Sequence, residues 1–129
     1  MPHIGAFTIL VPSYDAGIAF YCGKLGFNLL QDLPQPGKRW VTIAPPGATE
    51  TRIVLAEPTS ERQQAALGNQ TGGRIGFFLH TDNFARDHAA MRAAGVQFDE
   101  EPRHEPYGVV AVWRDPWGNG WDLIEPTAT

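Results

Sequence analysis

Two stretches of this chain repeat one pattern: V-P-S-Y-D-A-G-I-A-F-Y-C-G-K-L-G at residues 11–26 and T-D-N-F-A-R-D-H-A-A-M-R-A-A-G at residues 81–95. Each reads as the end of a strand, an amphipathic helix, and a glycine suited to the left-handed conformation that ends a helix. Gly26 and Gly95 lie 69 positions apart in a chain of 129 residues, and an apolar, strand-like run follows each glycine. We therefore expect a small domain built by duplication, with a cleft between its halves.

The remaining segments extend the repeat. Apolar alternation predicts strands and helical spacing predicts helices, separated by turns rich in Pro and Gly. The predicted strands are 4–11, 27–33, 38–44 and 51–57 in the first half, and 74–80, 96–99, 108–114 and 121–125 in the second. The predicted helices are 13–24, a short one at 61–67, and 84–93, while 34–37, 102–106 and 115–119 are expected as turns or loops.

Each half therefore has the order β-α-β-β-β. The predicted fold class is α+β: one domain over residues 1–129, with a first module at about 4–57, a linker at 58–73 and a second module at about 74–125. We expect the two sheets to join into one curved mixed sheet with the helices outside and the cleft inside. Along each strand, side chains alternate between the helix side and the cleft side.

Composition narrows the function classes. With 43% hydrophobic and 11% aromatic residues, the chain can bury a core. A net charge of −4 and scattered basic residues disfavour a nucleic-acid or anionic membrane surface. No apolar run approaches the roughly 20 residues of a membrane span, and no secretory signal is recognised. The single cysteine, Cys22, reads as a core residue, and we expect a cytoplasmic protein.

Two motifs carry a family resemblance. The segments A-F-Y-x-x-x-L-G-F at residues 19–27 and D-P-x-G-N-x-x-D-L-I-E at residues 115–125, together with the duplication, resemble the vicinal oxygen chelate (VOC) superfamily. That group contains glyoxalase I, bleomycin resistance proteins, fosfomycin-resistance transferases and extradiol dioxygenases. The resemblance implies the fold over nearly the whole chain and a homodimer. Because one fold can serve many chemistries, it leaves the activity open.

The resemblance also shows where a metal centre would lie. It places the ligand positions of metal-using members on Ala6, Val54, Gly76 and Asp122, and a slip of one residue would replace the first three by Phe7, Ile53 and Ile75. Only Asp122 has a donor atom. The histidines, His3, His80, His88 and His104, show no spacing that makes ligands converge. We expect no cofactor; a divalent metal on shifted ligands is the alternative.

Asp122 and His80 are the candidate catalytic residues. Alternation puts Asp122 and Ile124 on one face of their strand and Trp121 and Leu123 on the other. In an apolar cleft, Asp122 would anchor a ligand or act as a base with a raised pKa. The alternative is a structural salt bridge, for example with Arg39 or Arg52. His80 ends a strand at the cleft side and could act as a base.

Ligand contacts are expected from aromatic and arginine side chains near the cleft. Arginine offers a bidentate contact to an anionic group and aromatic rings offer stacking. For each residue a structural alternative stays open: an exposed strand end, core packing, or a proline-stiffened loop. The candidates are Arg39, Trp40, Phe78, Arg103, Tyr107 and Trp113.

Two main functions follow from the sequence. One is a metal-independent protein of the bleomycin-resistance type that binds a small aromatic or amphipathic molecule between apolar walls. The other is an enzyme of the glyoxalase, lyase or dioxygenase type, with shifted metal ligands or with Asp122 as an acid–base group. A third reading is an interaction module without a well-formed cleft. The missing metal ligands favour the first.

Overall fold

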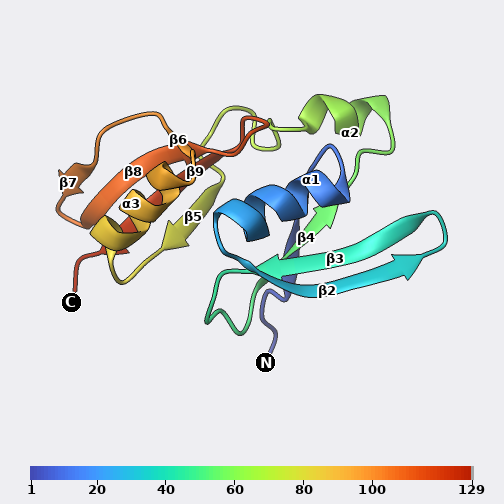
Figure 1. Ribbon diagram of the computed structural model, residues 1–129, viewed down its shortest axis with the longest axis horizontal. Helices are drawn as coiled ribbons and strands as arrows, with labels where there is room; N and C mark the ends of the chain where they lie inside the picture. The colour runs from blue at the N-terminus through green and yellow to red at the C-terminus, as the bar shows by residue number, and fades with distance from the viewer. Residues whose placement is uncertain (129) are drawn as a thin grey trace. The chain divides into compact units, whose positions relative to one another are not determined.

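A computed structural model of the chain describes residues 1–128 (Figure 1). It consists of two compact units: unit 1 spans Met1–Leu67, and unit 2 begins at Gly68. The boundary falls within the stretch 58–73. Each unit holds its own sheet. The single-domain organisation and the joining of the sheets around a cleft stay predictions.

Unit 1 has the order β-α-β-β-β followed by a short helix. Its sheet has the strand order β1-β4-β3-β2, in which β1 runs parallel to β4 and the other pairs are antiparallel. The elements are β1 (Ala6–Leu10), α1 (Tyr14–Ile18), the π-helix η1 (Ala19–Lys24), β2 (Asn28–Gln35), β3 (Lys38–Ala44), β4 (Arg52–Ala56) and α2 (Glu61–Ala66).

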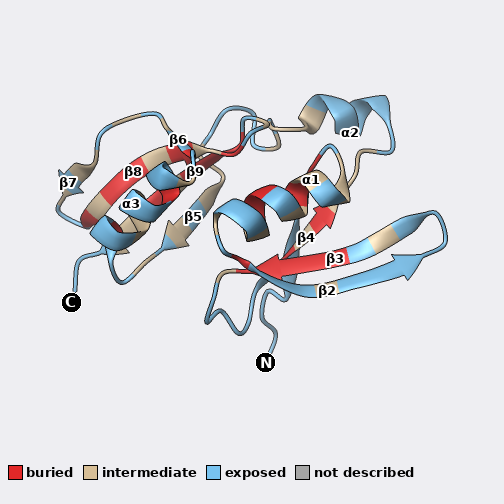
Figure 2. Cartoon of the chain, viewed as in Figure 1, coloured by how far each residue is buried: buried red, intermediate tan, exposed pale blue. Residues whose placement is uncertain are grey.

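The core of unit 1 lies between its sheet and the α1–η1 helix. Ile9, Leu55 and Val41 occupy one row across β1, β4 and β3, and all three are buried. Phe20 and Tyr21 of η1 are buried as well, with their rings in edge contact at 5.0 Å. Figure 2 shows burial concentrated on β3, β4 and one side of the helix, whereas the edge strand β2 is mostly exposed.

Unit 2 repeats the order with one extra strand. Its sheet has the order β5-β9-β8-β6, with β5 parallel to β9, and β7 pairs with β8. Trp113 and Trp121 stack in its core, with ring centroids 4.9 Å apart. The elements are β5 (Phe77–His80), α3 (Phe84–Ala93), β6 (Gln97–Phe98), β7 (Arg103–Glu105), β8 (Gly108–Arg114) and β9 (Gly120–Pro126).

The main helix of each unit begins with an equivalent hydrogen bond. A glutamate at the end of the neighbouring strand accepts a hydrogen bond from the first backbone N–H of the helix: Glu57 from Tyr14 at 3.0 Å, and Glu125 from Phe84 at 2.7 Å. We call this contact the strand-to-helix latch. A carboxylate here satisfies a free helical N–H and opposes the positive end of the helix dipole. The last residue of the motif D-L-I-E thus has a structural role.

The latch makes a testable contribution to stability. Replacing Glu125 with alanine is expected to lower the free energy of unfolding by about 1–2 kcal/mol, because an N–H group at the helix start loses its charged acceptor. Urea denaturation followed by circular dichroism measures the change. Glu50→Ala is the control, since Glu50 is exposed and outside the helices and strands. Equal midpoints for the two variants would contradict a role for the latch.

The α+β class and the repeated β-α-β-β-β order are confirmed, with four local corrections. The predicted strand 74–80 begins only at Phe77. The loop expected at 102–106 contains β7. The strand β2 continues through Pro34, which is compatible with its place at the sheet edge. The second half of the first helix is a π-helix. Both predicted helix-ending glycines are left-handed, with φ of 77° at Gly26 and 88° at Gly95.

None of the helices within residues 1–128 is long and apolar enough to cross a membrane.

Candidate functional site

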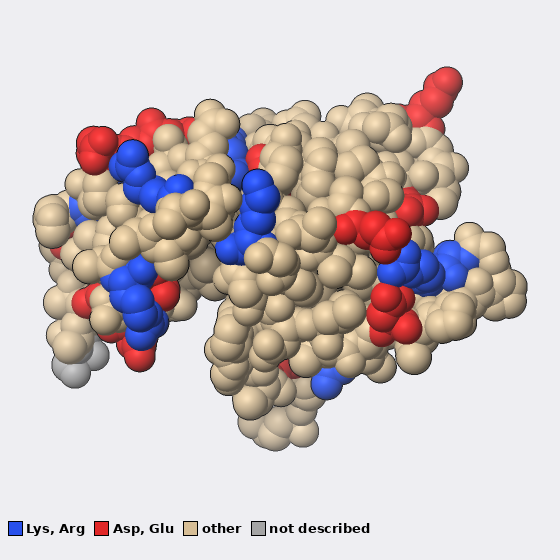
Figure 3. Space-filling model, in the orientation of Figure 1, with Lys and Arg blue, Asp and Glu red and all other residues tan. Residues whose placement is uncertain are grey.

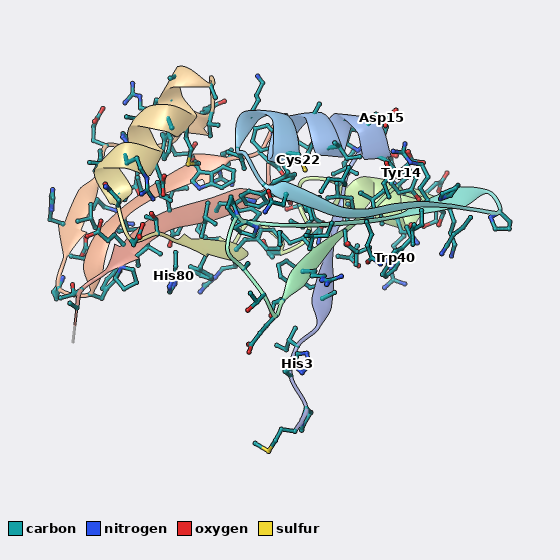
Figure 4. All side chains as sticks on the ribbon, turned by 60° about the horizontal axis from the view of Figure 1, so that its bottom comes forward. His3, Tyr14, Asp15, Cys22, Trp40 and His80 are labelled. Carbon is teal, nitrogen blue, oxygen red and sulfur yellow. The ribbon has the colours of Figure 1, made fainter. Side chains whose placement is uncertain are left out.

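In each unit, the sheet has one face toward its helix and one face away from it, here called the far face. In unit 2, strand register puts Phe78, Asp122 and Val112 in one row on the far face. The next row contains His80 and Ile124. Phe78 is 60% exposed, and His80 projects from β5 on the side away from α3 (Figure 4). The register therefore brings both candidate catalytic residues and Phe78 onto one surface.

Asp122 has the most distinctive environment on this face. Its Oδ1 atom is buried and makes no hydrogen bond, and no salt bridge involves this carboxylate, within the part of the chain that the structure describes. Burial raises the pKa of Asp122; the positive charge of Arg103 acts in the opposite direction, and Glu100 adds to the rise. Because Asp122 is partly exposed while its Oδ1 is buried, a bound molecule would contact this carboxylate through its exposed part.

Arg103 is held beside Asp122 by two other carboxylates. Its guanidinium donates to Glu100 at 2.8 Å and to Glu105 at 3.1 Å, and Glu100 and Tyr107 raise the pKa of Arg103. Glu100 also accepts the backbone N–H of Val112 at 2.9 Å, which ties this group to the middle of β8. Arg103 and Tyr107 therefore belong to the same region as Asp122, but Arg103 directs its hydrogen bonds to partners within the protein.

Unit 1 presents a second polar group on its far face. The side-chain oxygen of Gln31 accepts hydrogen bonds from Trp40 Nε1 at 3.0 Å, Thr42 Oγ1 at 3.1 Å and Arg52 Nη1 at 3.4 Å. Trp40 is 39% exposed, and Leu33, its partner across the strand pair, is 49% exposed. Trp40 thus lies where it can contact a ligand, with its indole held by a hydrogen bond.

Arg39 lies on the opposite face from Trp40. Its guanidinium binds Asp15 at 2.9 Å and Asp32 at 2.8 Å, and it lies 5.2 Å from the ring centre of Tyr14. Figure 4 shows Tyr14 and Asp15 on the helix side of the sheet and Trp40 on the other side. Arg39 and Trp40, both candidate ligand contacts, therefore lie on different faces of the sheet, because neighbours along a strand point to opposite faces.

Trp113 also lies away from the far face. It is 0% exposed, belongs to the row of Phe77 and Trp121 on the helix side, and stacks on Trp121. The expected ligand contact is therefore corrected to core packing, the alternative open from the sequence. Alternation within β9 is as predicted: Trp121 and Leu123 are buried, whereas Asp122 and Ile124 are partly exposed.

Two residues of these faces were missed by the sequence reading. Gln31 is an ordinary glutamine in an edge strand, and Glu100 is one of several acidic residues at 99–101. Their roles follow from partners far along the chain, Arg52 for Gln31 and Val112 for Glu100. No local spacing signals such contacts.

The positions that the resemblance marks for a metal do not fit one. Ala6, Val54 and Gly76 have no side-chain donor atom, which leaves Asp122 alone among the four. Within residues 1–128, no group of three or more His, Cys, Asp or Glu side chains is placed to hold an ion.

A cavity of about 510 Å³ lies elsewhere in unit 2, at the β6 edge. Its acidic side chains Asp99 and Glu100 are already paired with Arg114 and Arg103, each at 2.8 Å. Charges of both signs are also interspersed over the surface shown in Figure 3, without one large patch. The cavity lining is Arg92, Val96, Gln97, Phe98, Asp99, Glu100 and Glu101.

Comparison with known proteins shows the family to which the chain is related. The model of the Glyoxalase/Bleomycin resistance protein/Dioxygenase superfamily matches residues 3–123. An uncharacterized protein of Shewanella frigidimarina is 42% identical over 92% of this chain and 89% of its own length. The crystal structure of UcmS2 is similar with a TM-score of 0.86 and 32% identity, covering 97% of this chain and 98% of that one. TnmS3, an antibiotic binding protein from Streptomyces sp. CB03234, is similar with a TM-score of 0.80 and 31% identity over 98% of both chains.

Proposed function

This chain belongs to the Glyoxalase/Bleomycin resistance protein/Dioxygenase superfamily, and from that premise we propose that it is a metal-independent binding protein for a small aromatic or amphipathic molecule. The far face of unit 2 supplies an unsatisfied acceptor, Asp122, beside the exposed ring of Phe78. A few polar anchors among apolar walls are the usual composition of a small-molecule site.

The unsatisfied Oδ1 of Asp122 carries this proposal. A buried acceptor without a partner costs free energy, and a ligand-binding site is one setting in which a fold retains that cost. The donor-free positions Ala6, Val54 and Gly76 favour binding over metal chemistry. The similarity to TnmS3, an antibiotic binding protein, supports a small molecule as the ligand class.

A binding assay with Asp122→Asn tests the proposal. The probe is 2-naphthylmethylammonium, a flat ring with a charged N–H donor, titrated by calorimetry. We expect the variant to bind it at least about tenfold more weakly, because a charge-assisted hydrogen bond is lost. The fold should be unchanged, since Oδ1 has no partner within the described residues. Glu50→Gln, which removes a carboxylate elsewhere on the surface, is the control.

The affinity measured in this assay should depend on pH. Burial raises the pKa of Asp122, so the ionised form that attracts the ammonium group is lost at a higher pH than for an ordinary aspartate. Affinity should therefore fall as the pH is lowered through the raised pKa, and Asp122→Asn should abolish this dependence. No binding by the wild type, or equal affinity in wild type and variant, would overturn the proposal. Recovery of a chemically altered probe would instead support an enzyme that uses Asp122 and His80.

A further inference from the structure

The strand β2 contains an irregularity that determines which way Gln31 points. Leu29 pairs with Ile43, whereas Gln31 pairs with Thr42, so Leu30 is an extra residue in the ladder. In regular pairing Leu30 would face Thr42 and Gln31 would face Val41, whose side chain is buried on the helix side. The bulge therefore moves Gln31 to the far face, a typical effect of bulges near binding sites.

Several hydrogen-bond donors surround the side-chain oxygen of Gln31. Three donors, from Trp40, Thr42 and Arg52, meet its Oε1 atom, which has two lone pairs. This contact fixes the amide orientation, and the NH₂ group of Gln31 makes no hydrogen bond within residues 1–128. Arg52 has the longest of the three contacts, at 3.4 Å, and this neutral amide is the one side-chain partner of its guanidinium among the described residues. The group therefore has unused N–H donors on Gln31 and Arg52, while the amide oxygen of Gln31 is already occupied.

Within the residues that the structure describes, the protein leaves the positive charge of Arg52 uncompensated. The half-buried arginines elsewhere, such as Arg39 with Asp32 and Arg103 with Glu100, are neutralised by carboxylates of the protein. Arg52 is exposed and has no carboxylate partner within the described chain. The exposed apolar surface of Trp40 and Leu33 lies in the next row of the same face.

We propose that Gln31, Arg52 and Trp40 form a contact site for the carboxylate of a flat aromatic acid. The guanidinium of Arg52 and the NH₂ of Gln31 bind the two oxygens, and the ring lies against Trp40 and Leu33. Guanidinium and amide donors suit a planar carboxylate geometrically, and arginine remains charged at every physiological pH. This inference rests on the proposed function, small-molecule binding, and adds the chemistry of a second contact.

The test uses 2-naphthoate, which has the ring of the ammonium probe and the opposite charge. Arg52→Gln and Gln31→Glu are each expected to weaken its binding at least about tenfold in calorimetric titrations. The carboxylate introduced by Gln31→Glu can still accept from Trp40, Thr42 and Arg52, so this variant retains the local hydrogen bonds while replacing the NH₂ donors with a negative charge. Arg62→Gln, on the exposed surface of α2, is the matched control for the loss of one positive charge.

The two probes separate this inference from the proposed function. If 2-naphthylmethylammonium binds through Asp122 while 2-naphthoate does not bind, or binds equally to wild type, Arg52→Gln and Gln31→Glu, the donor site is overturned and the proposed function stands. Equal loss in Arg62→Gln would also overturn it, because net charge alone would explain the effect. If neither probe binds, both proposals fail.

Discussion

Replacement of Gly68 by alanine is expected to destabilise unit 2 strongly. A Cβ atom at this position would lie 1.7 Å from the backbone oxygen of Trp117, and the backbone φ is +72°. The clash is with main chain, so no side-chain rotation relieves it. The clash and the cost of a left-handed non-glycine residue should together lower the free energy of unfolding by more than about 3 kcal/mol. Thermal denaturation should show a midpoint lower by about 10 °C or more.

Gly72→Ala is the matched control for this prediction. Gly72 has nearly the same backbone angle, φ +68°, but its Cβ would meet nothing within 4 Å. Gly72→Ala should lower the free energy of unfolding by only about 1 kcal/mol, which is the conformational cost alone. The difference between the two variants measures the contact of residue 68 with the turn at Trp117. Equal midpoints for the two variants would show that this close approach does not exist in solution.

Loss of the Asp115 carboxylate is expected to have the second largest effect. Asp115 is 3% exposed, and its Oδ1 accepts the backbone N–H groups of Trp117, Gly118 and Asn119 at 3.1, 3.0 and 2.9 Å. Its Oδ2 accepts the side-chain amide of Asn119 at 2.7 Å. Alanine would leave several donors without an acceptor, at least one of them buried. We expect Asp115→Ala to cost about 3 kcal/mol or more, measured by urea denaturation.

Two further variants sharpen this measurement. Asp115→Asn retains one side-chain oxygen for the turn but opposes its NH₂ to that of Asn119, so an intermediate loss is expected. Asp82→Ala removes an exposed carboxylate that pairs with Arg86 on the surface, and should cost less than about 1 kcal/mol. If Asp115→Ala were as mild as Asp82→Ala, the carboxylate would not organise the turn.

The fold was predictable because its signals are local. Helical spacing, the terminal glycines and the turn residues at 115–119 each act over a few positions, and the structure places a helix end or a hairpin turn at each of them. The bonds of Asp115 and the latch of Glu125 explain two fixed positions of the motif D-P-x-G-N-x-x-D-L-I-E. In both cases a carboxylate satisfies backbone N–H groups.

The site was harder to predict because it depends on register. Alternation correctly separated Asp122 from Trp121, since both lie on one regular strand. It could not show that Trp113 pairs with Trp121 on the buried side, or that Arg39 turns toward the carboxylates of the helix side. Which side chains lie opposite each other on neighbouring strands depends on how the strands pair, and short sequence patterns do not determine that pairing.

The extra residue at Leu30 has a consequence for how such proteins diversify. Deleting that one residue would make the pairing regular and leave Gln31 opposite Thr42 on the far face, because Leu29 and Gln31 would then be consecutive and keep their present partners. The chain on either side could keep its strands, because edge-strand bulges tolerate such a change better than a central strand would. This position is thus a place where a lineage can gain or lose one residue while the residues that follow it keep their partners and their faces.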